Sequence, residues 1–400
     1  MHQPTSPEPR LPRIPRDRSD DYDPKIVARR RALCEGAAGR DLLHMAGKPL
    51  APAEARGNVE NLIGFMQIPL GIAGPLCVHT SSGWREVYVP MATSEGAMVA
   101  SYSRGMRLLK DAGGARARVL TEGLSQHPML LYADGATAQR GGEWARHQYA
   151  ELAEIVVGLS QHGRLRQIVP QVIGRRLILR LVFETGDAIG INMASLAADR
   201  IARRVMEQTS AEQYFVHGQD VEKRANARAQ VEGRGRYTLA EITIPRDVLE
   251  GVMRVTPEQM VDIHRSYCVG FAQLGTQNWA VQIANGLAAV FLACGQDVAY
   301  LTESATGWLD LEVDTRGNLY AALTLPSLIV GTVGGGTGLS SASECLDILG
   351  CRGAGKVQIF AELLAATALA GDLSLMAAFC AHEFVAAHEA LGRNRPGGQA

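Results

Sequence analysis

Apolar and polar positions alternate along the chain with two periods, one typical of strands and one typical of helices. A short apolar run ends at Met91. From Met98 to Leu109, apolar residues then recur three or four positions apart, which predicts a helix. Glu95 lies between the two segments. We therefore expect its carboxylate in a strand-to-helix turn, beside the backbone N–H groups that begin the helix.

The same patterns predict further elements. Helices are expected over 24–36, 143–160, 192–208 and 339–349, strands over 167–183 and 323–330, and a polar loop over 219–235. Residues 127–215 mix helix and strand patterns, as a small separate domain would. An Ala-rich pair of helices, divided near Gly371 and Asp372, closes the pattern.

The stretch from Ser266 to Gln296 carries no charged residue and is long enough to span a bilayer. Amide side chains interrupt it at Gln273, Gln277, Asn278, Gln282 and Asn285. Polar groups at this density favour a buried helix that faces a wet site, so we expect a central core helix. Asp297 would then end this helix at its negative pole, where a carboxylate needs a neutralising cation.

Composition narrows the class of function. Hydrophobic residues make up 46% of the 400, enough for a large core, and a net charge of -1 gives no field to attract nucleic acid or an anionic membrane. The seven cysteines are odd in number and lack a metal-ligand spacing, which favours a reducing cytoplasm and no metal site. Residues 1–23 are rich in proline and charge, so we expect a tail without a signal peptide. Small-molecule chemistry is the function class that remains.

Lysine is rare among the 40 basic residues. Lys223 lies between Glu222 and Arg224, where a solvated charge run is the commoner explanation. Lysine can release a proton, however, and Lys223 would supply the cation that Asp297 needs. We expect Lys223, Asp297 and Glu95 to form a proton-handling centre.

Residues 331–337 hold a run of glycines between a predicted strand and a predicted helix. Such glycines let backbone N–H groups approach an anion or a thioester, although a tight turn would need them too. Their spacing is not that of the Rossmann fingerprint. Residues 350–356 have the spacing of a phosphate-binding loop, but Val357 replaces its Ser or Thr, and we reject that motif.

Histidines near the end of the chain are also candidates. His382 and His388 lie six residues apart, which places them on different helix faces, so we reject a zinc site. His388 falls near the end of the last predicted helix, where an imidazolium is favoured. A lone histidine there is more often a surface residue.

Five motifs stand in a fixed order: Glu60-Asn61-Leu62-Ile63-Gly64, Met91 to Gly96, Gly186 to Met193, Gly295-Gln296-Asp297 and Gly331 to Thr337. Together they resemble the 3-hydroxy-3-methylglutaryl-coenzyme A (HMG-CoA) reductase family, over Pro24 to Asn394, and are closer to its class I branch. The resemblance implies an α+β fold with a large domain around a central helix and an inserted ferredoxin-like dinucleotide-binding domain. The implied boundaries are a tail at 1–23, a helical N-terminal part at 24–60, the large substrate and coenzyme A domain at 61–126 and 225–394, the small NADP-binding domain at 127–215, a catalytic lysine loop at 216–224 and a tail at 395–400.

The family reduces an acyl-CoA thioester to an alcohol with two hydrides from NADPH. Its catalytic residues match Glu95, Lys223, Asp297 and His388. The resemblance implies that Lys223, tuned by Asp297, stabilises the carbonyl oxyanion. It implies that Glu95 protonates the carbonyl oxygen, for which a partly desolvated site is expected, and that His388 protonates the departing thiolate.

The resemblance also assigns binding residues and partners. For NADPH these residues are Ser160, Arg164, Asp187, Ala188, Ile189, Gly190 and Asn192. For the acyl-CoA substrate they are Ser101, Ser103, Arg104, Gln126, Arg224, Gln282, Asn285, Gly335, Gly336 and Thr337. Subunits of a cytoplasmic homodimer or homotetramer would share active sites, with no nucleic-acid or membrane partner.

Some positions depart from the family. Gln126 and Val216 stand where an arginine and a serine usually grip the acyl group, and Gln282 replaces a histidine. Losing one bidentate arginine contact to a carboxylate typically costs about 1.5–3 kcal/mol of binding. Gln161 replaces a cofactor arginine, for which Arg164 could substitute, so NADH is not excluded.

Three functions stay open. The first is reduction of HMG-CoA to mevalonate for isoprenoid biosynthesis, which the complete catalytic set favours. The second is reduction of a different acyl thioester, because the acyl-binding positions are altered. The third is a relative that binds a thioester without redox chemistry. The retained Lys223 and His388 argue against the third function. Catalytic residues that reduce stability are expected to be the first replaced once a protein no longer needs its activity.

Overall fold

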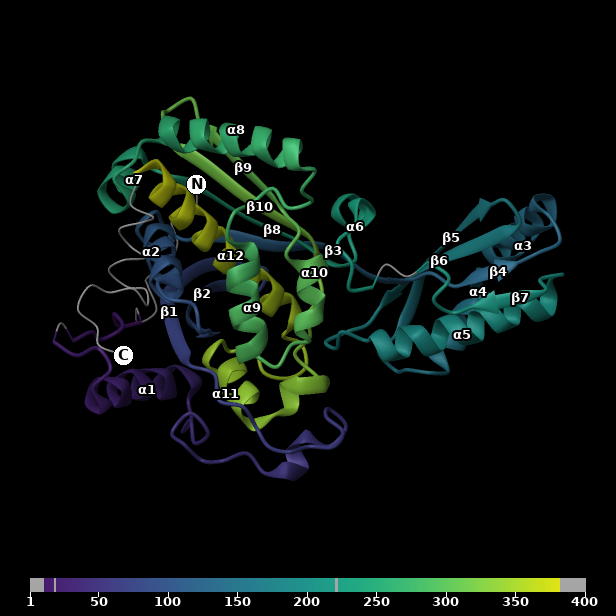
Figure 1. The fold of residues 1–400 in the computed structure, drawn as a ribbon, viewed down its shortest axis with the longest axis horizontal. Helices are drawn as coiled ribbons and strands as arrows, with labels where there is room; N and C mark the ends of the chain where they lie inside the picture. Colours follow the sequence, from purple (N-terminus) through teal and green to yellow (C-terminus); the bar gives the residue numbers. More distant parts are fainter. Residues whose placement is uncertain (1–10, 18, 220–221, 382–400) are drawn as a thin grey trace.

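The structure is a computed structural model that describes residues 11–17, 19–219 and 222–381 (Figure 1). Its helices are α1 (Pro24–Ala38), α2 (Met98–Asp111), α3 (Gly135–His147), α4 (Tyr149–Val157), α5 (Ile191–Gln208), α6 (Ala227–Glu232), α7 (Arg246–Met253), α8 (Pro257–Leu274), α9 (Ile283–Ala293), α10 (Leu301–Ser304), α11 (Ser340–Ile348) and α12 (Val357–Cys380), with short 3₁₀ helices η1 (Pro52–Ala55), η2 (Val298–Tyr300) and η3 (Gly335–Gly338). Its strands are β1 (Leu70–Thr80), β2 (Gly83–Ala92), β3 (Ala115–Gln126), β4 (Met129–Leu131), β5 (Arg164–Ile173), β6 (Arg176–Glu184), β7 (Gln213–Phe215), β8 (Gly235–Ile244), β9 (Trp308–Val313) and β10 (Leu319–Leu328).

The larger part of the molecule is built on a sheet in which β9, β10, β8 and β3 follow one another, all antiparallel (Figure 1). At its edge β1 meets β3 in a short parallel pair and β2 folds back on β1. Every second residue of β8 is buried, as the two-residue period of a strand with one covered face requires. Helix α12 packs on this sheet against β3, β8 and β10.

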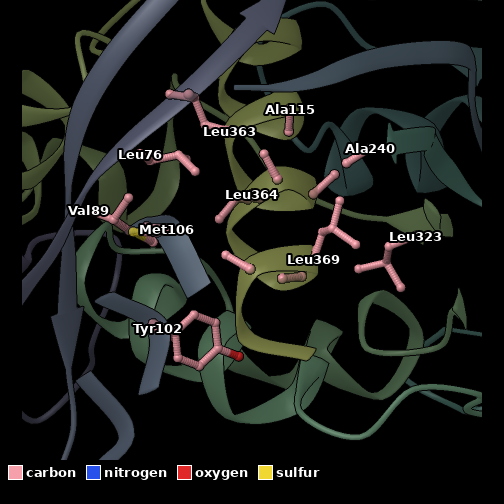
Figure 2. Packing of buried hydrophobic residues seen from close by; sticks show 14 of the residues in the cluster. Leu76, Val89, Tyr102, Met106, Ala115, Ala240, Leu323, Leu363, Leu364 and Leu369 are labelled. Carbon is pink, nitrogen blue, oxygen red and sulfur yellow. The ribbon is translucent and has the colours of Figure 1, made fainter. Parts of the chain in front are cut away.

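Helix α12 is the centre of the core. Figure 2 shows Leu363, Leu364 and Leu369 of α12 among buried side chains from β1, β2, α2, β8 and β10. It is the one described helix long and apolar enough to cross a membrane, and 83% of its most apolar window is buried inside the structure. Such burial is typical of a core helix, because a membrane span would show its apolar side chains to lipid.

Two sequence predictions about the core were wrong. The uncharged stretch 266–296 is not one helix, because α8 ends at a left-handed Gly275 and α9 begins only at Ile283. The predicted C-terminal helix pair is the single helix α12, which runs through Gly371. A Cβ at Gly371 would lie 2.4 Å from the Tyr102 ring, so this glycine permits close packing and does not break the helix.

A second, smaller unit contains β4, α3, α4, β5, β6, α5 and β7 (Figure 1, right). Its strands lie in the order β7, β4, β6, β5, each antiparallel to its neighbour. This βαββαβ order is the ferredoxin-like arrangement that the resemblance implied. The unit has its own core, in which Leu177, Phe183 and Ile201 are fully buried. The predicted strand over 167–183 is a hairpin of β5 and β6 that turns at Gly174.

Strand β3 joins the two units. Its first part pairs with β8 of the large sheet, and its end, Leu124 to Gln126, pairs with β6 of the small unit. The elements that follow the small unit, from β8 onward, return to the large sheet. The loops of the small unit therefore lie close to those of the large one at this junction.

The N-terminal part packs on α11. Cys34 and Leu42 are buried with Ile348 of α11 in one small cluster. The Glu344 carboxylate of α11 accepts the backbone N–H groups of His44 and Met45 at 3.0 and 3.1 Å. Residues 57–69, which lead into β1, form no helix or strand.

Candidate active site

Lys223 and Asp297 form an ion pair in which Nζ lies 3.0 Å from Oδ2. The two side chains are 41% and 43% exposed, so the ammonium group is accessible to a ligand. Lys223 lines an open hollow together with His217, Glu222 and Arg224. A cation that is held by a carboxylate beside such a hollow is placed to stabilise an oxyanion.

Asp297 does not end a helix, contrary to the prediction. Helix α9 ends at Ala293, and Gly295 then turns the chain with φ of 64°. Asp297 is the N-cap of η2, where its Oδ1 accepts the backbone N–H of Ala299 at 3.0 Å. A carboxylate is favourable at that end of a helix. One oxygen of Asp297 thus caps η2 while the other holds Lys223.

Glu95 lies in the predicted turn, between the end of β2 and the start of α2. The Asn285 side-chain amide of α9 donates to both of its oxygens, at 3.1 and 2.9 Å. Glu95 is exposed, so the partly desolvated site that we expected is not formed by this chain's described residues alone. Among those residues no hydrogen bond or ion pair joins Glu95 to Lys223 or Asp297, so the three residues expected to form one centre belong to two separate pairs.

The glycine segment 331–337 packs against the turn that carries Asp297. The Gln296 side chain donates to the Gly331 carbonyl and accepts the Gly331 N–H, both at 2.9 Å. A Cβ on Gly336 would lie 2.6 Å from the Gly295 carbonyl oxygen, so only glycine fits there. Gly335 is exposed at the start of η3, and Thr337 is buried. Two of the motifs that carried the resemblance therefore meet in space.

The candidate cofactor residues gather at the end of the small unit that faces these glycines. Ser160 accepts the Gly163 N–H at 3.0 Å, and the Arg164 side chain is exposed beside it. A Cβ on Gly331 would lie 2.9 Å from the Ile189 nitrogen, so residues 187–189 touch the glycine segment. Helix α5 begins after Gly190, at Ile191 and the exposed Asn192, without a side-chain cap. Its first N–H groups suit an anion.

Asp187 has a contact that the sequence did not predict. Its carboxylate accepts the backbone N–H groups of Gly355, Lys356 and Val357 at 2.8, 3.0 and 3.2 Å. These groups begin α12, so a residue of the cofactor loop caps the central helix. The Asp187 carboxylate occupies the helix N-terminus that follows the rejected phosphate-loop motif.

The candidate coenzyme A residues on α2 contact the core. Ser101 donates to the Gln282 side chain at 3.3 Å and lies 3.1 Å from the Ser374 hydroxyl of α12. Arg104 donates to the Ser374 hydroxyl and carbonyl at 3.0 and 2.5 Å. Ser103 is half-buried on the same helix. This face of α2 is therefore tied to α12.

The three acyl-binding positions that depart from the family, Gln126, Val216 and Gln282, place no positively charged side chain at the hollow beside Lys223. Gln126 is buried, and its amide donates to Ser195 of α5 at 3.3 Å. Val216 packs on the core of the small unit, and Gln282 is buried at the start of α9. Arg224 is exposed beside Lys223.

Sequence reasoning missed the buried acids around the site. Asp372 of α12 accepts the N–H groups of Val281 and Gln282 at 3.2 and 2.5 Å, while its Oδ2 has no hydrogen-bond partner among the described residues. Burial raises its pKa to about 7. Its one signal in the sequence is a charge inside an apolar run. Tyr300 and Glu303, three and six residues after Asp297, contact Lys223 and its loop, and nothing in the sequence indicated these contacts.

His388 lies outside the described residues, so its predicted place is not tested. In the ranges that the structure describes, no three or more His, Cys, Asp or Glu side chains are grouped to hold a metal ion.

The chain is similar to known proteins over most of its length. The family profile described as hydroxymethylglutaryl-coenzyme A reductase matches residues 26–393. The 3-hydroxy-3-methylglutaryl-coenzyme A reductase of Methanothermobacter thermautotrophicus is 39% identical, covering 92% of this chain and 94% of its own length. The enzyme of the same name from Haloferax volcanii is 40% identical, covering 91% of this chain and 92% of its own length.

The fold is also that of a solved structure. The class II 3-hydroxy-3-methylglutaryl-CoA reductase of Streptococcus pneumoniae, bound to NADPH in open conformations, superposes with a TM-score of 0.74 at 19% identity, covering 90% of this chain and 98% of that one. The predicted α+β fold is confirmed, whereas the likeness to the class I branch is not, since this neighbour is a class II enzyme. Because the profile spans nearly the whole chain and both relatives align over more than nine-tenths of it, the chain belongs to the hydroxymethylglutaryl-coenzyme A reductase family.

Proposed function

We propose that this chain is an NADPH-dependent oxidoreductase that reduces HMG-CoA to mevalonate and free coenzyme A, with two hydride transfers. The relatives of that name span more than nine-tenths of the chain. The observation that carries the proposal is the Lys223–Asp297 pair at 3.0 Å, at the edge of a hollow and beside the glycine segment.

Each residue of the site has a proposed role. The Lys223 ammonium donates to the thioester oxygen and stabilises the charge that develops there, while Asp297 holds the ammonium in place. Glu95 delivers a proton to the carbonyl oxygen, with Asn285 fixing its carboxyl group. His388, outside the described residues, protonates the thiolate of coenzyme A.

The residues at the end of the small unit fit a dinucleotide. The uncapped N-terminus of α5, an 18-residue helix, suits a pyrophosphate. NADPH bound there supplies the hydride. Ser160 lies in the neighbouring loop and Arg164 begins β5 directly after it, so we propose Arg164 as the cation that selects NADPH over NADH. The Asp187 carboxylate, which caps α12, would orient the loop Ala188, Ile189 and Gly190 against the cofactor.

The test is a stoichiometric assay. Wild-type protein with HMG-CoA is expected to oxidise two NADPH for each coenzyme A thiol released, and to form mevalonate. Lys223→Ala should abolish turnover, whereas Lys25→Ala, an exposed lysine on α1, should leave it unchanged. Absence of HMG-CoA turnover with either NADPH or NADH would refute the proposal.

A second candidate function keeps the reduction and changes the acyl group. It is favoured by the burial of Gln126, whose amide is engaged with Ser195 and does not face the hollow as a cation would. A panel of acyl-CoA thioesters of different length and charge separates the two functions. A higher kcat/KM for a thioester without a terminal carboxylate would favour this second candidate.

The assembly belongs to the proposal too. We propose a homodimer or homotetramer in which subunits share active sites, because Glu95 is exposed in the single chain and the apolar residues Val59, Ile63 and Met66 are exposed as well. Sedimentation of the full chain tests this. The domain boundaries, the cytoplasmic location and the class I likeness stay predictions.

A further inference from the structure

Lys223 is held through its backbone as well as its side chain. Its φ is 57°, in the left-handed region that a lysine rarely adopts. Its backbone N–H donates to Glu303 Oε1 of α10 at 2.6 Å. A charge-assisted hydrogen bond of this kind offsets the strain of the backbone.

Glu303 is itself firmly anchored. It is fully buried, and both of its oxygens accept from the Arg234 Nη1 at 2.9 Å. The Arg234 Nε donates to the Ser125 carbonyl at the end of β3. Burial raises the pKa of Glu303, and the neighbouring Arg234 counteracts this effect. The backbone of the lysine loop is thereby fixed to the junction between the two units.

Tyr300 contacts the same loop through two groups. The Lys223 Nζ lies 5.0 Å from the centre of the Tyr300 ring, a cation–π distance. The Tyr300 hydroxyl donates to the Glu222 carboxylate, the residue before Lys223. Burial raises the pKa of Tyr300, so the hydroxyl keeps the proton that it donates. One side chain therefore fixes two consecutive residues of the loop.

We propose that Tyr300 is a positioning residue for the reaction, whose ring keeps the Lys223 ammonium beside Asp297. Asp297, Tyr300 and Glu303 follow one another at three-residue intervals, so a single short segment holds the lysine by its ammonium group, its π contact and its backbone. The expected effect of Tyr300 on turnover rests on the proposed catalytic role of Lys223, whereas its contact with the ammonium group does not.

Two kinds of variant separate the ring from the hydroxyl. Tyr300→Phe removes the hydroxyl and keeps the ring. Tyr300→Leu and Tyr300→Met both remove the ring, and their side chains leave different amounts of its volume unfilled. Removing the ring is expected to lower kcat about two- to fivefold, the size of an exposed cation–π contact, with little change in KM for the thioester. Tyr300→Phe should restore most of this kcat. The matched control is Tyr320→Leu with Tyr320→Phe, because the hydroxyl of Tyr320 on β10 also donates to a glutamate, Glu241 of β8, at 2.8 Å.

A chemical readout tests the contact without turnover. The pH dependence of reductive methylation of Lys223 is followed by mass spectrometry of the full chain, digested after reaction. The groups that face Lys223 are Asp297, Tyr300, Glu303, Glu222, Arg224 and His217. With the ring removed and these groups kept, methylation of Lys223 should begin about 0.3–0.7 pH unit lower. Lys110, paired with Glu86 at 2.6 Å, is the internal control in the same sample.

The outcomes are distinct. A shift at Lys223 in both Tyr300→Leu and Tyr300→Met, absent in Tyr300→Phe and at Lys110, supports the inference. An unchanged Lys223 profile in the two ring-less variants overturns it, even if the enzyme is active. Failure of wild-type HMG-CoA reduction would instead count against the proposed function, and the methylation profile would still decide the role of the ring.

Discussion

The side-chain amide of Asn285 on α9 donates to both carboxylate oxygens of Glu95, at 3.1 and 2.9 Å. Glu95 follows β2 and Asn285 lies 190 residues later, so two distant segments together orient this carboxyl group. Lys223 and Asp297 form a second pair. The site thus consists of one acid fixed by an amide and one cation fixed by a carboxylate.

Asn285→Ala should lower kcat about 10- to 100-fold, because a hydrogen bond to a charged group contributes about 1.5–3 kcal/mol. Asn285→Asp places a second negative charge beside Glu95, which favours the protonated carboxyl group, and should move the alkaline limb of the kcat profile to higher pH. Asn318→Ala is the control, since its amide also donates to a carboxylate, Asp314, at 3.2 Å, in a distant turn. Full activity in Asn285→Ala would show that Glu95 needs no such orientation.

Asp187→Ala should weaken both the fold and cofactor binding. It removes the cap of α12, which should cost about 0.5–2 kcal/mol of unfolding free energy. It also releases the loop 188–190 from α12, so KM for NADPH should rise while KM for the thioester changes less. Urea unfolding and steady-state kinetics measure the two effects.

Asp134→Ala is the matched control for Asp187. Asp134 caps α3 of the small unit by accepting the Thr137 N–H at 2.7 Å. Asp134→Ala should lower the free energy of unfolding by a similar amount to Asp187→Ala, without changing KM for NADPH. An equal rise of that KM in both variants would mean that lost stability alone is responsible.

Asp372 makes stability depend on pH. Its pKa is about 7 in the folded chain and 3.8 for an ordinary aspartate, so the folded state binds this proton more tightly. Its contribution is fully present below about pH 3.8 and is lost as pH rises through about 7. Each pKa unit corresponds to about 1.4 kcal/mol, so the loss is of the order of a few kcal/mol.

Asp372→Asn should remove this dependence, because the amide cannot ionise. Urea unfolding between pH 4 and 8 measures it, with the exposed Asp262→Asn on α8 as the control. The variant should gain stability relative to wild type as pH rises. If wild type and Asp372→Asn lost the same amount of stability as pH rises, Asp372 would not be the group responsible for the pH dependence.

Gly105→Ala should destabilise the core. A Cβ there would lie 1.8 Å from the Ala370 carbonyl oxygen of α12, so α2 and α12 would have to move apart. Overpacking of this kind typically costs about 1–3 kcal/mol. Gly270→Ala on α8, with open space around its Cβ, should instead stabilise the helix by about 0.5–1 kcal/mol. Thermal unfolding of the two variants compares them directly.

The sequence by itself determined the local elements and the chemistry of the candidates. Helix α2 and the turn at Glu95 followed from apolar spacing, because a helix that buries one face must repeat with its own period. The ferredoxin-like unit and the pairing of Lys223 with Asp297 followed from the resemblance and from charge. Signals of this kind depend on residues that are close together in the sequence.

Only the tertiary structure decided which elements lie at the centre and what each charged group touches. The uncharged stretch 266–296 looked central, yet α12 fills the core, because burial depends on packing partners as well as on the polarity of one segment. Asp187 caps a helix 168 residues away and Glu303 binds the Lys223 backbone 80 residues away. Such contacts arise when the sheet brings distant loops together, so no spacing within the sequence can predict them.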